Sequence, residues 1–375
     1  MRKKNLCLYH NHIDNLSFTI KAEEKLNKQN FCTDIYDILK KYKNYIDNIN
    51  INSWDFYKKK TNDYEYIEKK NKIVLNTPIS RAWFKLHEII IDYNLLLDKN
   101  DLTIVGLAEG PGGFMQCISD FRKKNNDYFV CMSLVSTKES IPSWNKSYDF
   151  KKKNIHIFNG QDNTGNIYLI ENIIALKKHL KNKADLVTCD GGFNYSVNYN
   201  NQEQLSYRLI LCQIICTLNI LKKNGNMVIK IYDIFTTFTL KILYFLTSLF
   251  EEINIVKPFT SRMANSEKYI ICKNFYDINE LYLENLNKIV KKWNEYESKN
   301  LYIYDIFNFE TPQEFNDLIY SYNFNVSYNQ VKTILKTIIY LNIKIDSKYI
   351  NNRLTYFAIE WCKKYKINYK KLVYS

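Results

Sequence analysis

Between residues 100 and 275, apolar positions alternate between short continuous runs and longer segments with helical spacing. The short runs have the length and composition of strands buried in a sheet, and they are Leu102–Leu107, Tyr128–Leu134, Ile155–Phe158, Ala184–Asp190, Met227–Asp233, Asn254–Lys257 and Lys268–Cys272. Helices are predicted from about Phe114 onward and over Ile167–Leu180, 201–221 and Thr236–Phe250. This alternation predicts a parallel sheet covered by helices, with a hairpin of the last two strands at its end.

Glycine marks the same central region. The chain has only nine Gly and five Pro, and most Gly fall in clusters at 106–113, 160–165 and 191–192. The flanks are rich in Lys, Asn, Tyr and Ile. We therefore expect an α/β domain at 71–275 between mostly helical accessory segments at 1–70 and 276–375. Periodicity alone fits a methyltransferase, a dehydrogenase or another nucleotide-binding fold.

The formal charge predicts affinity for polyanions. Lys and Arg number 53 and Asp and Glu 39, which gives a net charge of +14. RNA, DNA and acidic membranes all attract such a surface, and charge does not choose among them.

Abundant Asn, Lys, Ile and Tyr also reflect an AT-rich genome, such as that of a large DNA virus. The apolar runs Leu209–Leu221 and Leu240–Phe250 are shorter than the roughly 20 residues that cross a bilayer.

The cysteines indicate a reducing environment. All nine are scattered singly without a CxxC pair, which argues against a disulfide framework. Cys7, His10 and His12 lie close enough to suggest a metal site, but a fourth ligand at suitable spacing is missing, and an ordinary N-terminal segment is the preferred interpretation. No signal-peptide pattern follows Met1–Lys4. We expect an intracellular protein of the cytoplasm or nucleus.

The strongest local signal is the turn after the first predicted strand, Leu107–Phe114. Glycine lets the backbone turn sharply and lets a ligand approach closely. The helix that starts there offers free N–H groups to an anion. The spacing is not GxGxxG and no GKS or GKT follows, which disfavours NAD-binding and P-loop folds.

The string Glu109–Phe114 resembles the cofactor loop of the FtsJ-like ribose 2′-O-methyltransferases. Further strings match that family in the same order, and they are Ser80–Leu86, Cys189–Phe193, Gln202–Gln204, Val228–Asp233 and Ser261–Tyr269. The last string is similar to the SRxANSERY-type motif of the cap-specific mRNA 2′-O-methyltransferases. The resemblance leaves residues 1–70 and 276–375 uncovered.

This resemblance implies a Rossmann-like methyltransferase sheet of seven strands, S-adenosyl-L-methionine as cofactor and capped mRNA as substrate. The methyl acceptor would be the ribose 2′-hydroxyl of the first transcribed nucleotide. The catalytic residues implied are Lys85, Asp190, Lys230 and Glu267. The cofactor-binding residues implied are Ser80, Ala108, Glu109, Gly110, Pro111, Gly112, Gly113 and Phe114, with Asp162 near the adenine. The substrate-binding residues expected are Glu203, Arg262 and Asn265.

The positions of the four catalytic candidates support this assignment. Asp190 and Lys230 lie at or near the carboxyl ends of predicted strands, where α/β sheets bind ligands. Glu267 opens the last strand. Lys85 lies off the apolar stripe of a helix that Thr77–Pro78 would begin. Taken singly, the lysine of a helix is most often a solvated charge, and the two acids fit a strand end and a surface position. Lys230 interrupts an apolar strand, so its charge must be paired or functional.

These residue types suit attack of a hydroxyl on a sulfonium methyl group. A ribose hydroxyl is a weak nucleophile at neutral pH, so it needs a base or a group that stabilises the developing charge. Lys230 is the candidate for that group, and repulsion from Lys85 would favour its neutral amine. Asp190 and Glu267 would position the lysines. The donor already carries a positive charge, and no metal is implied.

Two departures from the family pattern concern the cofactor. The segment Cys131–Leu134 offers no acidic residue for the cofactor ribose, and Asn166 replaces the aspartate usual in its stretch.

The flanks hold further aromatic residues. Trp54, Phe56 and Tyr57 would stack on a 7-methylguanine base or, as is more usual, pack in the core. The C-terminal segment, with Trp293, Tyr296 and Trp361, would grip RNA, dock other capping or transcription proteins, or stabilise the fold.

Two alternatives remain open at this point. A ribose methyltransferase of ribosomal or transfer RNA would keep the chemistry and change the substrate. A non-catalytic capping subunit that binds RNA or the cofactor would keep only the fold, and it would be expected to lack part of the tetrad, whereas all four positions are filled here.

Overall fold

The computed structural model describes residues 2–6, 13, 16–26, 30–68, 73–75, 78–95, 99–123, 126–138, 141–144, 148–151, 154–192, 199–343 and 345–370. Its centre is an eight-stranded sheet with the strand order β1-β8-β9-β7-β6-β3-β4-β5. The strands are β1 (Lys3–Asn5), β3 (Thr103–Leu107), β4 (Tyr128–Met132), β5 (Ile155–Ile157), β6 (Ala184–Cys189), β7 (Leu221–Ile231), β8 (Phe250–Val256) and β9 (Lys268–Phe275).

The pairing of the strands confirms the predicted sheet. Strands β5, β4, β3, β6 and β7 run parallel, and β9 pairs antiparallel with both β7 and β8. All seven predicted strands are present, with the terminal antiparallel hairpin. The eighth strand, β1, comes from the N-terminal flank and pairs antiparallel with β8, where Lys4 lies opposite Ile255. Its three polar residues show no apolar alternation, so no strand was predicted there.

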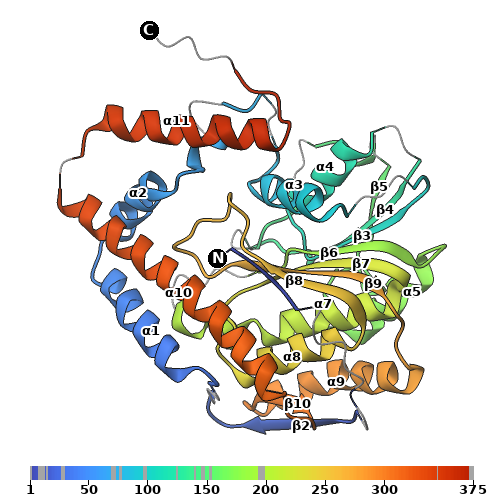
Figure 1. The fold of residues 1–375 in the computed structure, drawn as a ribbon. Coiled ribbons are helices and arrows are strands. Elements are labelled where there is room, and N and C mark those ends of the chain that lie inside the picture. The colour runs from blue at the N-terminus through green and yellow to red at the C-terminus, as the bar shows by residue number, and fades with distance from the viewer. Residues whose placement is uncertain are drawn as a thin grey trace.

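Helices cover both faces of the sheet (Figure 1). On one face lie α3 (Ala82–Tyr93) and α4 (Gly113–Phe121), and on the other lie α5 (Ile170–His179), α7 (Tyr207–Ile220) and α8 (Thr237–Thr247). The short helix α6 (Gln202–Leu205) precedes α7, and a 3-10 turn, η4 (Tyr199–Asn201), precedes α6. Each face has its own apolar cluster, represented by Phe84 and Met115 on the first side and by Leu211 and Phe238 on the second.

One predicted helix boundary was wrong. Helix α3 begins at Ala82, not at Thr77–Pro78, and Thr77 lies outside the described residues. Before the helix, the backbone N–H of Ile79 donates to the Gln116 side chain of α4 at 2.7 Å. The Pro78 segment is therefore fixed to the cofactor-loop helix instead of forming the first turn of α3.

The two flanks are mostly helical and contact each other. They contain α1 (Thr33–Asp47), α2 (Ile51–Thr61), the 3-10 turn η2 (Glu65–Ile67), α9 (Glu280–Ser298), α10 (Gln313–Asn342) and α11 (Ser347–Lys364). Strands β2 (Phe18–Glu23) and β10 (Tyr302–Phe307) join the flanks in a separate two-stranded sheet. Helix α10 packs on α1 and α2, as Figure 1 shows. The domain boundaries at 70 and 275 stay a prediction.

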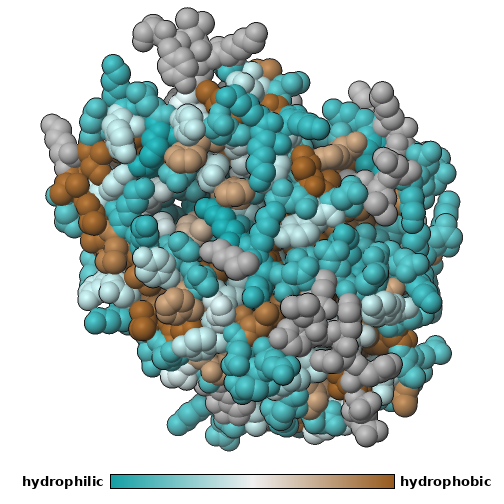
Figure 2. Space-filling model, viewed as in Figure 1, coloured by the Kyte–Doolittle hydropathy of each residue, from teal (hydrophilic) through white to brown (hydrophobic). Residues whose placement is uncertain are grey.

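The surface seen in Figure 2 is mainly hydrophilic. Among the helices of the described ranges, none combines the length and the apolar character that crossing a membrane requires.

Candidate active site

A cavity of about 1050 Å³ opens where the parallel strands end. Ala108, Met132 and Asp190, which end or directly follow β3, β4 and β6, line it together with Lys230, the last residue but one of β7. Ligands of α/β proteins bind at this edge of the sheet, because the strand-to-helix loops diverge there. The far side of the cavity is made by residues of the flanking helices α1, α2 and α10.

The structure brings the four catalytic candidates together in two ion pairs. Lys230 Nζ lies 3.2 Å from Asp190 Oδ1 and donates to the backbone oxygen of Asp190 at 2.6 Å. Lys85 Nζ lies 2.8 Å from Glu267 Oε1. Lys230, Asp190 and Glu267 line the cavity, and Lys85 approaches it through Glu267. Each lysine thus has a carboxylate partner on a different element.

Further hydrogen bonds hold the two carboxylates. The hydroxyl of Tyr269, a fully buried residue of β9, donates to Asp190 Oδ1 at 3.0 Å. The Ser261 hydroxyl donates to Glu267 Oε1 at 2.9 Å. Burial raises the pKa of Glu267, but the charges of Lys85 and Lys230 outweigh it and bring that pKa to about 2. Glu267 is therefore an ionised partner for the lysines and not a proton donor.

The glycine-rich turn brings the chain from β3 into α4. Gly112 has a φ of +108°, a conformation that side chains rarely adopt. Ala108 and Gly110 border the cavity. Gly113 lies behind them against Ser80, because a Cβ on Gly113 would lie 2.2 Å from the Ser80 oxygen. That oxygen is buried and has no hydrogen-bond partner among the described residues.

Glu109 lies beneath this turn and not on the cavity wall. Its side chain is 3% exposed, and the Thr188 hydroxyl on β6 donates to its Oε1. Its Oε2 is buried with no partner in the described part of the chain. Burial raises the pKa of Glu109 well above its ordinary value, against the opposing effect of the Thr188 hydrogen bond. The structure thus gives Glu109 a buried carboxylic acid group that supports the turn.

The loops that follow β4 and β5 give the cavity a wall of mixed apolar and polar character, of the kind that suits a nucleoside. Met132 and Ile167 supply apolar surface for a flat ring, and Ser133 and Asn166 supply polar groups beside it. Ser133 belongs to the segment Cys131–Leu134, which has no acidic residue to bind the ribose of the cofactor. Asp162, expected near the adenine, is exposed, and its Oδ1 accepts hydrogen bonds from the N–H and hydroxyl of Thr164 at 3.0 and 2.8 Å. The structure therefore places Asp162 off the cavity wall, in its own loop.

A family model described as FtsJ-like methyltransferase matches residues 78–275, more than half of the 375-residue chain. The chain belongs to this family. The matched region begins before Ser80 and ends with β9, so it contains all four residues of the two ion pairs.

Curated relatives carry cap-specific names. Cap-specific mRNA (nucleoside-2′-O-)-methyltransferase 1 of Mus musculus is 31% identical over 259 residues, which cover 64% of this chain and 30% of the relative. The protein of the same name from Dictyostelium discoideum is 34% identical over 262 residues, 63% of this chain and 34% of the relative. The chain thus spans about a third of the length of these two relatives.

A solved structure described as a ribosomal RNA methyltransferase from Plasmodium falciparum has a TM-score of 0.40 at 22% identity. The superposition covers 53% of this chain and 99% of that one.

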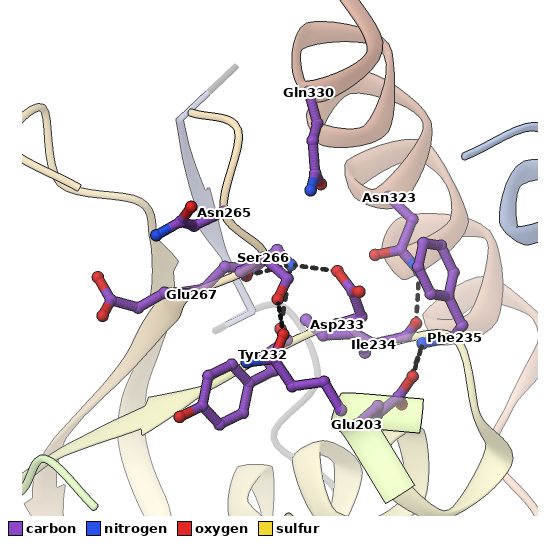
Figure 3. A network of polar contacts seen from close by, with 12 residues as sticks. Glu203, Tyr232, Asp233, Ile234, Phe235, Asn265, Ser266, Glu267, Asn323 and Gln330 are labelled. Atoms are coloured by element: carbon purple, nitrogen blue, oxygen red, sulfur yellow. Dashed lines mark hydrogen bonds and ion pairs between the residues drawn. The ribbon is translucent and has the colours of Figure 1, made fainter. Parts of the chain in front are cut away.

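Of the three substrate-binding candidates in this family member, only Asn265 lines the cavity. Arg262 forms a two-point ion pair with Glu65 of the N-terminal flank, with Nε–Oε2 at 3.0 Å and Nη2–Oε1 at 2.6 Å. Glu203 is buried and accepts the backbone N–H groups of Phe235 and Thr236 at 3.0 Å (Figure 3). Arg262 and Glu203 thus have protein partners in place of the expected substrate.

The aromatic candidates also differ in whether they reach the cavity. Trp54 is 5% exposed and borders the cavity, whereas Phe56 is 54% exposed and packs edge to face on Tyr57 with a centroid distance of 5.1 Å. In the C-terminal flank, Trp293 and Trp361 are buried in the two main apolar clusters, and the partly buried Tyr296 packs against the first of them. Core packing accounts for these last three residues.

Several cavity residues come from the flanks, where sequence analysis did not find them. Lys43 of α1, Lys58 of α2 and Gln330 of α10 all line the cavity. Lysine is so abundant in this chain that its position carries no signal, and Gln330 lies in an ordinary amphipathic helix. Within the described residues, no group of three or more His, Cys, Asp or Glu could hold a metal ion, and Cys7, His10 and His12 lie outside them.

Proposed function

We propose that this chain transfers the methyl group of S-adenosyl-L-methionine to the ribose 2′-hydroxyl of the first transcribed nucleotide of capped mRNA. The observation that carries the proposal is the pair of ion pairs, Lys230 with Asp190 and Lys85 with Glu267, at the edge of a cavity large enough for a cofactor and a nucleotide. Membership in the FtsJ-like methyltransferase family supports the reaction class. The cap-specific names of relatives at 31% and 34% identity support the substrate.

The cofactor end of the cavity lies beside the glycine-rich turn. Ala108, Gly110, Met132, Ser133 and the segment Gly165–Ile167 would hold S-adenosyl-L-methionine there. When bound, this cofactor supplies an electrophilic methyl group on a positively charged sulfur. The residues present fit it, because apolar surface and hydroxyl and amide groups alternate along the wall between the ends of β3 and β5.

Lys230 is the group that acts on the attacking oxygen. Its ammonium is fixed by the carboxylate and by the backbone oxygen of Asp190, so it has a single defined position at the cavity wall. As the neutral amine, Lys230 would accept the proton of the acceptor hydroxyl, and the ammonium formed in this way would stabilise the negative charge on that oxygen until it takes the methyl group. Tyr269 holds Asp190, and Glu267 holds the second ammonium, Lys85. Neither carboxylate needs to touch the methyl group.

The RNA end of the cavity is formed by Asn265 together with the flanking helices. Lys43 and Lys58 bring ammonium groups to it, paired with Asp233 and Asp55 respectively, and Trp54 brings an aromatic side chain. Ammonium groups attract phosphates of any sequence, and an aromatic ring suits the positively charged base of a methylated cap. This combination supports capped RNA as the substrate.

The test is a methylation assay with radiolabelled S-adenosyl-L-methionine on three substrates. They are a short capped RNA, the same RNA without its cap, and an RNA of ribosomal or transfer sequence. We expect incorporation into the capped RNA and little into the other two. Equal incorporation with and without the cap would contradict cap specificity, and no incorporation into any RNA would contradict catalysis.

A further inference from the structure

The segment Ala264–Glu267 forms one wall of the cavity, and each of its four carbonyl oxygens accepts a hydrogen bond from a side chain. The bonds are Gln330 Nε2 to Ala264 O (2.9 Å), Lys257 Nζ to Asn265 O (2.6 Å) and to Glu267 O (2.8 Å), and Lys268 Nζ to Ser266 O (2.9 Å). Figure 3 shows Gln330 reaching from α10 toward this segment. A turn would ordinarily satisfy such carbonyls with backbone N–H groups or water, so this wall is held almost wholly by side chains.

Lys268 also joins the wall to the strand that carries Lys230. Its ammonium donates to the backbone oxygen of Tyr232 at 3.0 Å and lies 3.3 Å from Asp233 Oδ1. Tyr232 follows the end of β7, two residues after Lys230. One buried ammonium therefore contacts both the wall that bears Glu267 and the strand end that bears Lys230, and it fixes the spacing between them.

The burial of these lysines indicates that they serve position more than stability. Lys257 is 1% and Lys268 2% exposed, and removing an ammonium from water is costly even when it is paired. Lys257 has no carboxylate within ion-pair distance among the described residues. Burial and the charge of Lys268 lower the pKa of Lys257 well below its ordinary value. A neutral amine keeps two N–H groups, which matches its two carbonyl acceptors.

Both flanks reach this network. Lys43 of α1 lies 2.9 Å from the second oxygen of Asp233, and Gln330 belongs to α10. Lys43 and Gln330 lie outside residues 78–275, the region that the family model matches, and both line the cavity.

We propose that Lys257, Lys268 and Gln330 are positioning residues that hold the Ala264–Glu267 wall for catalysis. They keep the Glu267 carboxylate against Lys85 and keep Asn265 at the cavity. Through Gln330, and through Lys43 and Asp233, the flanking helices take part in this positioning. The inference rests on the proposed methyl transfer for its effect on turnover, while the rigidity of the wall can be measured without it.

The rigidity of the wall is tested by hydrogen exchange in the full chain. Lys268→Met keeps the volume of the side chain, and Asp233 retains Lys43, so this variant is expected to fold. Gln330→Met removes the amide donor without touching a charge. Lys273→Met is the matched control, because Lys273 lies on β9 and pairs with Glu252 at 2.8 Å, away from the wall. We expect faster exchange in peptides spanning 258–268 for the first two variants and wild-type exchange for the control. Unchanged exchange in Lys268→Met and Gln330→Met would overturn the proposal.

The effect on catalysis is tested by a double-mutant cycle with Glu267→Gln. Turnover is expressed per site that binds S-adenosylhomocysteine, so that any unfolded fraction does not count. A misplacement on the order of 1 Å costs about 100-fold in rate, so we expect kcat to fall roughly 10- to 100-fold in Lys268→Met, with recovery in Lys268→Arg.

In the Glu267→Gln background, Lys268→Met should cause little further loss, because both changes act through one carboxylate. Two outcomes would overturn the positioning role. One is a double mutant whose loss of turnover is the product of the two single losses, and the other is a Lys268→Met variant as active as the Lys273→Met control. An inactive wild type would instead refute the methyl transfer, while the exchange measurement would still decide whether the wall is held.

Discussion

At the scale of single residues, the cavity balances positive groups against carboxylates on neighbouring strand ends. Lys230 is one of the few charges inside the sheet, and it is 9% exposed with Asp190 as its partner. A buried ammonium without such a partner would shift toward the neutral form or destabilise the fold. The carboxylates therefore have two effects, because they make the lysines tolerable in the sheet and they fix where the amine points.

Replacing Lys230 with alanine is expected to remove methyl transfer. In the proposed reaction the lysine acts on the attacking oxygen, so its loss should lower kcat by about 10²- to 10⁴-fold and leave cofactor affinity nearly unchanged. Lys222→Ala is the control, because Lys222 lies on the same strand with a side chain that is 41% exposed and pairs with Asp185. Turnover is measured with radiolabelled donor and affinity by calorimetry. Normal turnover in Lys230→Ala would rule out its role.

Because of the raised pKa of Glu109, we expect its contribution to stability to decrease as the pH rises, which is the opposite of the usual effect of a carboxylate. The unfolded carboxyl ionises near its ordinary pKa of 4.5, whereas burial raises the folded pKa well above that value. The folded state therefore binds more protons between the two values. Its contribution to stability is complete below about pH 4.5 and is lost as the pH rises through the folded pKa, by about 1.4 kcal/mol per pH unit.

Glu109→Gln should remove this dependence. Urea unfolding of both proteins at about pH 5 and pH 8 would measure it, since stability is usually greatest in this range. We expect the free energy of unfolding of the wild type, relative to Glu109→Gln, to be lower at the higher pH. An equal difference at both pH values would show that the carboxyl titrates normally.

The candidates that line the cavity include residues for which a motif and a physical signal agreed in the sequence. Lys230 interrupts an apolar strand, Asp190 ends one, and both signals are local. Arg262 was assigned to RNA because a guanidinium suits phosphate, and the structure gives it Glu65, a partner 197 positions away. Glu203 was assigned to the substrate by the family resemblance, and its buried carboxylate accepts the backbone N–H of Thr236 at the start of α8. Long-range pairing of this kind leaves no trace in the spacing of residues.

At the scale of elements, the period of the apolar residues predicted the sheet because its strands are buried on both faces. The alternation of strands and helices predicted a parallel sheet with a terminal hairpin, but it did not give the order of the strands, in which β3 lies between β6 and β4. Strand β1 escaped prediction because pairing at a sheet edge needs only backbone groups, and its residues are Lys3, Lys4 and Asn5. The start of α3 was wrong because Ile79 is fixed by a side chain of another helix.

A side chain at Gly112 in the glycine-rich turn is expected to abolish cofactor binding without removing any group that acts in the reaction. At Gly112, any side chain would adopt a strained φ of +108°, and a Cβ would lie 2.7 Å from the Phe150 ring. Such strain costs on the order of 1–3 kcal/mol, and the turn would move away from the cavity. Thermal unfolding with S-adenosylhomocysteine should show a rise in Tm for the wild type and none for Gly112→Val. Stabilisation of the wild type by NAD instead would contradict the cofactor assignment.

At the scale of the whole molecule, the flanks complete a cavity that the central domain only begins. Strand β1 extends the sheet, β2 pairs with β10, and α1, α2 and α10 form the far side of the cavity. Composition predicted helical flanks but not their contacts, because each contact joins segments that are hundreds of residues apart. The +14 charge belongs to this scale as well, since it acts over the whole surface.

This charge predicts salt-sensitive binding of RNA with or without a cap. Counterion release ignores sequence, so affinity for either RNA should fall steeply between about 50 and 200 mM salt. Removing the cap should lower turnover far more than it lowers binding at low salt. Fluorescence anisotropy at several salt concentrations measures the binding, and the slopes for the two RNAs should be similar. Salt-independent binding would contradict an electrostatic contribution.

Methylation of the ribose 2′-hydroxyl is tested by removing one oxygen atom from the substrate. A short capped RNA is compared with the same RNA carrying a 2′-deoxy first nucleotide, and nuclease digestion with mass spectrometry locates any added methyl group. The 2′-hydroxyl is the group that Lys230 is placed to act on, and its loss leaves the phosphates intact. The proposed reaction predicts one methyl group on the first ribose of the normal RNA, and none on the deoxy RNA although that RNA still binds. A methyl group on a base, or on the deoxy RNA, would contradict it.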